Sequence, residues 1–385
     1  MAVKKVVILG STGSIGINTL KVIERFPKEF KVVGLTAYSN FKLLERQMHK
    51  FSPTHVAVSE VGIGYLKRRV LSKKIKIFNV KTDLEQIVSL KEVDIVVIAM
   101  RSSDALKPFL VAVRCGKIVA PANKEALVVA GEILMREAKK YGARIVPIDS
   151  EQSAIFQCLE RASVNAIKKV HLTASGGVLL DVPKAKFNKL SVNQILNHPR
   201  WKMGKKITVD SATLMNKGFE VIEAKMLFGL NSDQIDVVIH PEAIIHSMVE
   251  FMDGSVIAQL GITDMRLPIQ YALTYPKRFE TGLKSLDFFR LKQLNFRKPD
   301  MKKFPSLSLA LYVAKKGGTL PSVLNAVDEE AVDAFLEEKI SFTKIYDVVE
   351  KVVLKHKFKE KPSLVKIVEA DLWAREEARK VLNYK

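Results

Sequence analysis

The sequence predicts an α/β fold with an N-terminal doubly wound, Rossmann-like parallel sheet, a central α+β region and a C-terminal helical bundle. Three observations predict this fold. Short apolar runs alternate with helical patterns over residues 1–149. Mixed strand and helix patterns follow, and only helical periodicity is found after residue 305.

The first apolar run, residues 6–9, is uninterrupted, as expected for a strand buried on both faces of a parallel sheet. It ends at Gly10, and a helical pattern follows. A long helical pattern over 125–141 stops at Gly142, a residue suited to a left-handed C-terminal cap. Five further runs are predicted strands, at residues 31–35, 55–58, 94–99, 117–120 and 144–148.

Beyond Asp149 the predicted elements are mixed, and the dipeptide Asp253-Gly254 indicates a hairpin turn. We expect a domain at 1–149, a second at 150–275, a linker at 276–304 and a helical domain at 305–385. The predicted elements are a helix at 152–159, strands at 169–174, 234–239, 244–251 and 256–260, and helices at 307–316, 322–338, 343–354 and 363–382.

The composition is that of a folded globular protein with 385 residues. Its net charge of +21 comes from lysine and arginine residues scattered along the chain, so we expect surface lysines rather than a nucleic-acid-binding face. The two cysteines, Cys115 and Cys158, cannot form a disulfide framework. No apolar run is long enough to span a membrane, and we expect a soluble, unprocessed cytoplasmic protein.

The turn from Gly10 to Gly16 has the spacing Gly-x-x-Gly-x-x-Gly between a strand and a helix. This context favours dinucleotide binding, because backbone N–H groups and the helix dipole attract a pyrophosphate; the alternative is a mere tight turn. No Asp or Glu occurs between Lys31 and Phe41 to bind a ribose hydroxyl, so NADP is preferred over NAD. Candidate contacts to the 2′-phosphate are Tyr38, Ser39, Asn40 and Lys42.

Asp149 and Glu151 follow the last buried run, at the edge where ligands bind in open α/β sheets. Carboxylates two residues apart can share one hard cation such as Mg²⁺ or Mn²⁺. The alternative is that Asp149 or Ser150 caps the next helix. Glu220, at the edge of a helical stretch, is a candidate third ligand or an ordinary solvated residue.

Two segments have the hydroxyl and lysine groups of a phosphate cradle: Ser175-Gly176-Gly177, and residues 210–213 leading to Asn216-Lys217. Each is also compatible with ordinary turn chemistry. His198 and Trp201 lie in a polar loop that reads either as a lid over a ligand or as a satellite core. Lys124 is a ligand contact or a surface lysine.

Taken together, these segments resemble the 1-deoxy-D-xylulose 5-phosphate reductoisomerase family over essentially the whole chain. The similar stretches are Gly10 to Gly16, Ala122 to Glu125, Asp149 to Glu151, Ser175 to Gly177, His198 to Gly204, Asp210 to Glu220, His240-Pro241 and Asp264 to Arg266. The resemblance implies a homodimer whose subunit has an NADPH domain, a catalytic domain with a flap near 197–204, a linker and helices. It also implies a sugar phosphate substrate.

The resemblance assigns roles to individual residues. Lys124 and Glu151 are the candidate catalytic residues. The implied metal ligands are Asp149, Glu151 and Glu220, for Mg²⁺ or Mn²⁺, with Co²⁺ as a third candidate. The implied substrate contacts are Lys124, Ser150, Glu151, Ser175, His198, Trp201, Ser211, Asn216, Lys217 and Glu220. The implied cofactor contacts are Gly10, Thr12, Gly13, Ser14, Ile15, Ser39, Asn40, Asn123, Glu125 and Gly204.

This chain departs from many relatives at Tyr38-Ser39 and at Met100 to Ser103, so Arg101 is a further candidate for contacting the 2′-phosphate. The implied reaction converts 1-deoxy-D-xylulose 5-phosphate and NADPH into 2-C-methyl-D-erythritol 4-phosphate, in isoprenoid precursor biosynthesis. One alternative is another NADP-dependent oxidoreductase, such as a semialdehyde or homoserine dehydrogenase. The other is a basic nucleic-acid-binding protein on a dinucleotide fold.

Overall fold

The structure is a computed structural model that describes residues 2–69, 74–160, 162–201 and 203–383. Its contacts divide the chain into two compact units, each with its own sheet. The four segments expected from the sequence stay a prediction, and the contacts group residues 264–283 with the first unit. The first unit is Met1–Ala126, Glu132–Ser153 and Asp264–Leu283, and the second is Leu127–Gly131, Ala154–Thr263 and Lys284–Lys385.

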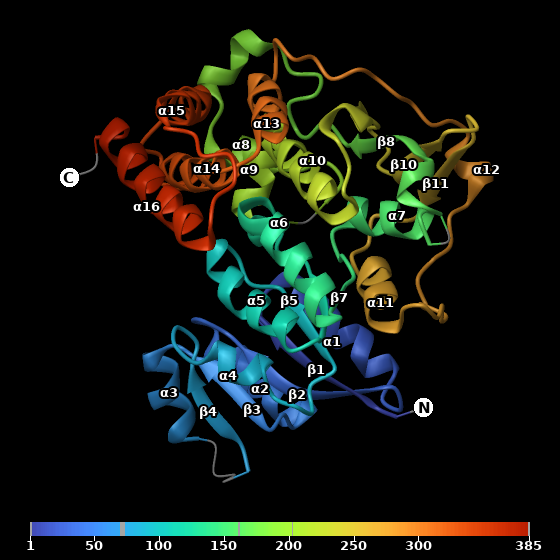
Figure 1. The fold of residues 1–385 in the computed structure, drawn as a ribbon, viewed down its shortest axis with the longest axis vertical. Helices are drawn as coiled ribbons and strands as arrows, with labels where there is room; N and C mark the ends of the chain where they lie inside the picture. The colour runs from blue at the N-terminus through green and yellow to red at the C-terminus, as the bar shows by residue number, and fades with distance from the viewer. Residues whose placement is uncertain (1, 70–73, 161, 202, 384–385) are drawn as a thin grey trace. The chain divides into compact units, whose positions relative to one another are not determined.

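The first unit contains a seven-stranded parallel sheet with the order β4-β3-β2-β1-β5-β6-β7 (Figure 1). This is the strand order of a doubly wound dinucleotide-binding sheet, with β4 added at one edge. The strands are β1 (Lys4–Leu9), β2 (Phe30–Thr36), β3 (His55–Val58), β4 (Lys76–Asn79), β5 (Ile95–Ile98), β6 (Ile118–Pro121) and β7 (Arg144–Ile145).

Burial explains which of these strands the sequence predicted. Residues 6–9 of β1 and all of β5 are inaccessible to solvent, and both strands are continuous apolar runs. Strand β4 was not predicted, because this edge strand is only partly buried and contains just two apolar residues, Ile77 and Phe78. An edge strand with one neighbour does not need an uninterrupted apolar sequence.

Helices follow most of these strands, and α11 packs against α1. The predicted cap Gly142 ends α6 with a φ of 66°. The helices are α1 (Ser14–Arg25), α2 (Phe41–Phe51), α3 (Glu60–Lys67), α4 (Leu84–Val88), α5 (Leu106–Arg114), α6 (Lys124–Tyr141) and α11 (Arg266–Thr274).

The second unit contains a four-stranded mixed sheet with the order β11-β10-β8-β9. β8 pairs with β9 in parallel, and the other two pairs are antiparallel. The predicted hairpin dipeptide joins β10 to β11, with Gly254 at a φ of 85°. The strands are β8 (Ile167–Ala174), β9 (Ile235–Ile239), β10 (Ile245–Phe251) and β11 (Val256–Leu260).

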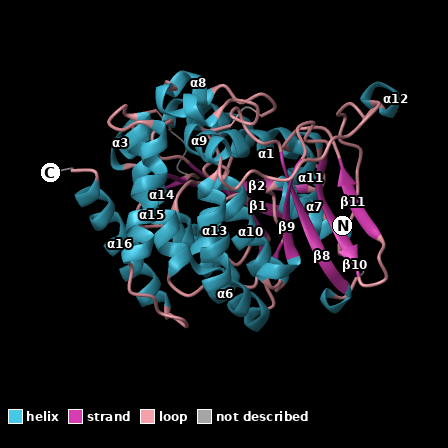
Figure 2. Cartoon of the chain, turned by 90° about the horizontal axis from the view of Figure 1, so that it is seen from above, coloured by secondary structure: helices cyan, strands magenta, loops and turns pink. Residues whose placement is uncertain are grey.

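Helices in the second unit share one hydrophobic core with this sheet, a core that includes Val170 of β8, Phe219 of α10 and Leu324 of α14. Helix α10 packs against β8, β9 and α13, and α14 contacts α15 and α16 (Figure 2). The predicted fold class is confirmed. The helices are α7 (Ser150–Cys158), whose first four residues belong to the first unit, α8 (Val192–Leu196), α9 (Lys205–Thr213), α10 (Met215–Phe228), α12 (Phe288–Leu291), α13 (Pro305–Lys316), α14 (Leu320–Leu336), α15 (Phe342–Lys355) and α16 (Leu364–Val381).

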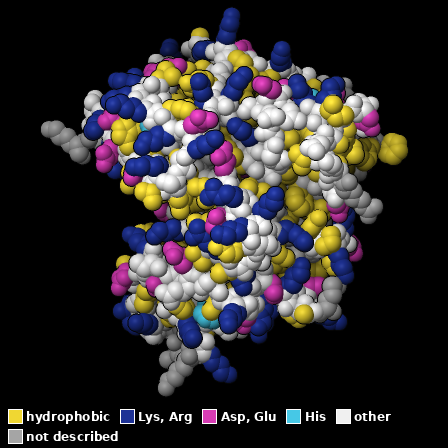
Figure 3. Space-filling view, in the orientation of Figure 1, with side chains coloured by type: hydrophobic (Ala, Val, Ile, Leu, Met, Phe, Trp, Pro, Cys, Tyr) yellow, Lys and Arg dark blue, Asp and Glu magenta, His cyan; other side chains and the backbone are white. Residues whose placement is uncertain are grey.

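The predicted linker has some regular structure. It contains α12, and Arg297 pairs with Ile239 of β9 through two backbone hydrogen bonds of 2.9 Å. The surface view shows lysine and arginine side chains spread over the visible face rather than gathered in one patch (Figure 3).

Candidate active site

The glycine turn after β1 brings the backbone very close to neighbouring segments. A Cβ atom at Gly16 would lie 2.3 Å from the carbonyl oxygen of Gly10, and one at Gly10 would lie 2.6 Å from that of Ala99. Gly13 is the N-cap of α1, no side chain caps this helix, and its first turn has no acidic residue. A pyrophosphate therefore fits the N-terminus of α1.

Gln47 of α2 holds the same turn in place. It accepts a hydrogen bond from the Ser11 hydroxyl at 2.7 Å and donates one to the Ser11 carbonyl at 2.9 Å. This contact was not predicted, because the two residues are 36 positions apart and no local pattern joins them.

The predicted cofactor contacts Ser39 and Asn40 are exposed just beyond β2, and the Asn40 side chain caps α2 by accepting the Leu43 N–H. Arg101 lies elsewhere. It follows β5, which is on the opposite side of β1 from β2. This position is beside the pyrophosphate turn rather than at the end of β2.

Asn123 links the loop after β5 to the start of α6 through hydrogen bonds. Its amide donates to the carbonyls of Met100 and Ser102 at 3.0 Å each, and its oxygen caps α6 by accepting the Ala126 N–H. Asn123 is only 2% exposed, so it positions this loop. Glu125, two residues later, is partly buried in the first turn of α6.

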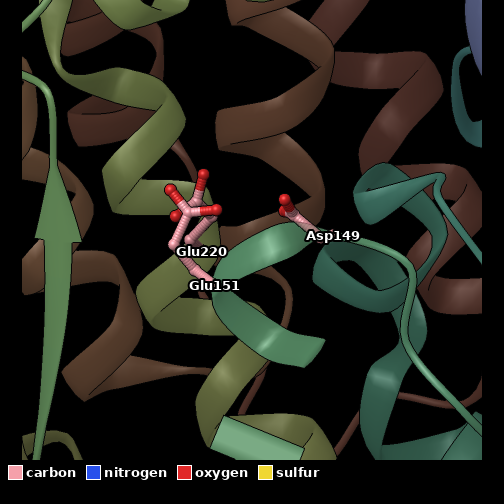
Figure 4. Close-up of side chains that lie close together, drawn as sticks. All are labelled: Asp149, Glu151 and Glu220. Atoms are coloured by element: carbon pink, nitrogen blue, oxygen red, sulfur yellow. The ribbon is translucent and has the colours of Figure 1, made fainter. Parts of the chain in front are cut away.

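Three carboxylates converge near the beginnings of two helices. Asp149 directly precedes α7, Glu151 lies in its first turn, and Glu220 lies on α10. One oxygen of each lies within 4.8 Å of the others, so among the described residues these three carboxylates form a group that could hold a metal ion. Figure 4 shows the Glu151 and Glu220 carboxyl groups side by side, with that of Asp149 facing them. Three carboxylates suit a hard divalent cation.

The predicted capping role of Asp149 and its predicted metal role are compatible. Its backbone carbonyl accepts the Ser153 N–H at 2.8 Å, so α7 begins here, while its carboxylate joins the group of three. The Ser150 hydroxyl donates to Glu151 at 2.5 Å. The first turn of α7 thus orients both carboxylates.

Two buried lysines pair with these carboxylates, which the sequence did not indicate. The Lys124 ammonium lies 2.8 Å from an Asp149 oxygen, and the Lys217 ammonium is paired with Glu220. Asn216 also donates to Glu220, at 2.6 Å. Together the three carboxylates and two ammonium groups have one negative charge in excess, which favours a bound cation.

The predicted phosphate-binding residues come from three adjoining turns. Ser175 follows β8, Ser211 lies in the last turn of α9, and Asn216 and Lys217 lie in the first turn of α10. A Cβ atom at Gly177 would lie 2.6 Å from the Ser211 carbonyl oxygen, so the first two turns are in contact. The start of α10 has no acidic residue in its first turn. Hydroxyl, amide and ammonium donors at a helix N-terminus suit a phosphate.

His198 links the predicted flap to this cluster. Its Nδ1 accepts the backbone N–H groups of Arg200 and Trp201 at 3.2 and 2.9 Å, so the proton of the neutral ring is on Nε2. Nε2 lies 3.3 Å from the Ser175 hydroxyl. Burial lowers the pKa of His198 below its usual 6.5, which keeps the ring neutral at pH 7.

The flap connects α8 to α9. Gly204 is the N-cap of α9, and the Trp201 ring is partly buried, with its centre 6.2 Å from that of the His246 ring. Lys202 lies outside the described residues.

His240 is fully buried, and its two ring nitrogens bond to the backbone of Asn295 and Ile244. These two hydrogen bonds give that histidine a structural role.

Family models match most of the chain. The model of 1-deoxy-D-xylulose 5-phosphate reductoisomerase matches residues 6–131, and that of its C-terminal domain matches 145–228. A third, DXP reductoisomerase C-terminal domain, matches 260–377. The 1-deoxy-D-xylulose 5-phosphate reductoisomerase of Thermoanaerobacter pseudethanolicus is 49% identical over 378 residues, covering 98% of this chain and 99% of that protein. The chain belongs to the 1-deoxy-D-xylulose 5-phosphate reductoisomerase family.

Other members of the reductoisomerase family are also similar to this chain over nearly its whole length. The protein of Endomicrobium trichonymphae is 46% identical over 383 residues, 99% of each chain. A crystal structure of the reductoisomerase with NADPH, fosmidomycin and magnesium has 40% identity and a TM-score of 0.93 over 99% of this chain and 98% of that one. The Zymomonas mobilis enzyme with NADPH has 37% identity and a TM-score of 0.93 over the full length of both.

Membership of the reductoisomerase family confirms the predicted enzyme class. The chain is an NADPH-dependent enzyme that acts on 1-deoxy-D-xylulose 5-phosphate. NADPH and a divalent metal are confirmed as its cofactors, with magnesium in the solved relatives. Mn²⁺ and Co²⁺ stay predictions. None of the described helices is both long enough and apolar enough to span a bilayer.

Proposed function

We propose that the conversion of 1-deoxy-D-xylulose 5-phosphate to 2-C-methyl-D-erythritol 4-phosphate takes place at the three carboxylates of α7 and α10. One observation carries this proposal: Glu220, which belongs to the carboxylate group, is one turn of α10 away from Asn216 and Lys217. A single helix thus presents a metal ligand and two phosphate donors to the same small substrate.

Asp149, Glu151 and Glu220 fit a divalent metal, and the glycine turn after β1 fits NADPH. A divalent metal held by these carboxylates would supply Lewis-acid chemistry for the rearrangement, and NADPH held at the turn would supply the hydride. Lys124 and Lys217 balance the charge of the carboxylates. The Ser150 hydroxyl fixes the rotamer of Glu151, so the ligand set is oriented before substrate arrives.

Ser175, Ser211, Asn216 and Lys217 bind the phosphate, which is remote from the reacting carbons. This binding provides free energy for closing the flap and excluding water. His198 donates from Nε2 because its Nδ1 is engaged by backbone N–H groups. Trp201 then offers a broad apolar face to cover the substrate carbons.

Lys124 and Glu151 are the two candidates for transferring a proton during the rearrangement. Both lie beside the carboxylate group, Lys124 through its ion pair with Asp149 and Glu151 as a member. Substituting Lys124→Met removes an ammonium proton donor, whereas Glu151→Gln removes a base. The pH profile of kcat for each variant identifies which limb of the profile disappears.

The test of this function is the loss of NADPH absorbance with 1-deoxy-D-xylulose 5-phosphate as substrate. We expect oxidation that depends on Mg²⁺ or Mn²⁺ and stops in excess chelator. Oxidation that continues unchanged in chelator would contradict the metal assignment, and no oxidation with metal present would contradict the site as a whole.

We also propose a homodimer that uses the β10–β11 hairpin. Among the described strands β11 has a neighbour on one side only, and Met252, Val256 and Ile257 of the hairpin are 68%, 53% and 48% exposed. An unpaired strand edge with exposed apolar residues favours association with a second copy. Light scattering should give twice the mass of the chain, and Ile257→Lys should shift it toward the monomer.

The cytoplasm is the compartment we propose. Cys115 is an exposed free thiol and Cys158 a buried one, which suits a reducing environment. Cell fractionation followed by detection of the chain tests this assignment.

A further inference from the structure

The end of β2, where the adenosine ribose of a dinucleotide lies in this fold, has no cation of its own. Residues 37–40 are Ala, Tyr, Ser and Asn, and the Asn40 oxygen is already used to cap α2. Hydroxyl and amide donors alone are weak partners for a phosphate with nearly two negative charges. Lys42, in the first turn of α2, is one candidate cation, and a second comes from another segment.

Lys81 lies in the turn between β4 and α4, yet its ammonium group is 5.8 Å from the centre of the Tyr38 ring. The parallel sheet explains this proximity. β3 pairs with both β2 and β4, so the carboxyl ends of all three strands meet at one edge. Backbone hydrogen bonds from Ser59 to Tyr38 and from Val80 to Val58 continue this alignment past the strand ends.

The turn that carries Lys81 has a defined conformation. The Lys81 N–H donates to the Asn79 side chain at 2.9 Å, and the Asn79 N–H donates to Asp83 at 2.9 Å. The Asn79 side chain also donates to Glu60 of α3 at 3.0 Å. Within the part of the chain that the structure describes, Lys81 itself makes no ion pair.

We propose that Lys81, held over the exposed ring of Tyr38, is the cation that receives the 2′-phosphate of NADPH and sets the preference over NADH. The inference rests on NADPH binding at the turn after β1. Tyr38 is 58% exposed, so a ligand can reach both its ring and the Lys81 ammonium group beside it. A phosphate on the 2′ position pairs with Lys81, whereas a 2′-hydroxyl gains little from a positive charge.

The test is calorimetric titration of the full chain with NADPH and with NADH. We expect Lys81→Ala to raise the Kd for NADPH about tenfold and to leave the Kd for NADH within about twofold. Lys76→Ala is the matched control, because Lys76 is an exposed lysine at the opposite end of the same strand. It removes the same charge and should change neither Kd.

Lys42→Ala decides between the two lysines near β2, since Lys42 lies in the first turn of α2. The proposal is wrong if Lys42→Ala removes the preference for NADPH while Lys81→Ala keeps it, or if Lys81→Ala weakens both cofactors equally. If the wild-type chain bound NADPH no more tightly than NADH, the cofactor assignment would be lost together with this proposal. Lys81→Ala should likewise raise the Kd for adenosine 2′,5′-bisphosphate, which has the 2′-phosphate, and leave the Kd for 5′-AMP, which lacks it, unchanged.

Discussion

Glu220 is the most buried member of the carboxylate group, at 1% exposure, and it also accepts from Asn216 and Lys217. We expect Glu220→Gln to lower kcat by about 100-fold or more, because the amide has no charge for a divalent cation and a Lewis-acid position contributes several kcal/mol. The assay is NADPH oxidation over a range of metal concentrations.

The control for this substitution is the Kd for NADPH, because the glycine turn after β1 belongs to the first unit and Glu220 to the second. An unchanged Kd for NADPH would show that the variant is folded. A kcat close to that of the wild type at every metal concentration would contradict the role of Glu220 as a ligand.

His198 makes the flap sensitive to pH. A proton on Nδ1 would abolish its hydrogen bonds from Arg200 and Trp201, and burial already lowers the pKa of this residue. The neutral ring stabilises the flap above pH 6.5, and this contribution is lost as the pH falls through the lowered pKa. We therefore expect acid to release the flap.

Fluorescence of Trp201 measures this release. Trp201 and Trp373 are the two tryptophans of the chain, so in a Trp373→Phe background the emission comes from the flap. Acid should shift it to longer wavelength. The His198→Asn variant keeps an acceptor that does not titrate, and its emission should stay constant. If acid shifted the emission equally with His198 and with Asn at this position, the shift would belong to another group, such as His246 beside the indole.

The flap as an element, residues 197–204 between α8 and α9, should close over ligand. In the Trp373→Phe variant, adding fosmidomycin with Mg²⁺ and NADPH should shift the Trp201 emission to shorter wavelength and reduce its quenching by iodide, because the indole leaves water. Emission that is already at short wavelength and unchanged by the inhibitor would show that the loop packs permanently.

Helices α10 and α13 approach each other through Gly218, where a Cβ atom would lie 2.2 Å from that of Ala310. We expect Gly218→Ala to destabilise the second unit by about 1–3 kcal/mol, since a packed interface accommodates an extra methyl group poorly. Thermal unfolding measures the change. Adding Ala310→Gly should restore part of the loss, because it removes the opposing methyl group.

The matched control is Gly64→Ala in α3, where a new Cβ atom would meet nothing within 4 Å. That variant should be unchanged or more stable by up to about 1 kcal/mol, because alanine favours a helix. Equal losses at the two positions would contradict the packing argument.

Contacts between distant segments hold α9 against α14 within the second unit. The Lys206 ammonium of α9 lies 2.6 Å from Asp210 and 2.8 Å from Asp328 of α14. Both carboxyl groups are almost fully buried. Burial and the charge of Asp328 raise the pKa of Asp210 well above its usual value, while the two carboxyl groups share one lysine.

We expect Lys206→Met to destabilise the chain by about 3–5 kcal/mol, because it leaves two buried acids without their cation. The exposed neighbour Lys205 provides the control, since Lys205→Met removes an equal charge from the same helix turn. Adding Asp328→Asn to Lys206→Met should recover stability in thermal unfolding. No difference between Lys205→Met and Lys206→Met would contradict the role of the cluster.

Local patterns in the sequence determined much of this fold. The buried strands β1 and β5, the cap at Gly142 and the hairpin at Gly254 were all predicted, because a strand buried on both faces, a left-handed cap and a tight hairpin turn each constrain consecutive residues. The carboxylates of the metal group were also candidates on their residue type and position. Their joint assignment needed the resemblance to the family.

Only the tertiary structure decided which side chains meet. The pairing of Lys124 with Asp149, the support of Ser11 by Gln47 and the proximity of Lys81 to Tyr38 join residues 25 to 43 positions apart. Such contacts depend on strand register and helix packing, which no short window of sequence specifies. The half-exposed strand β4, which positions Lys81, was missed for a related reason: an edge strand can form without an apolar run.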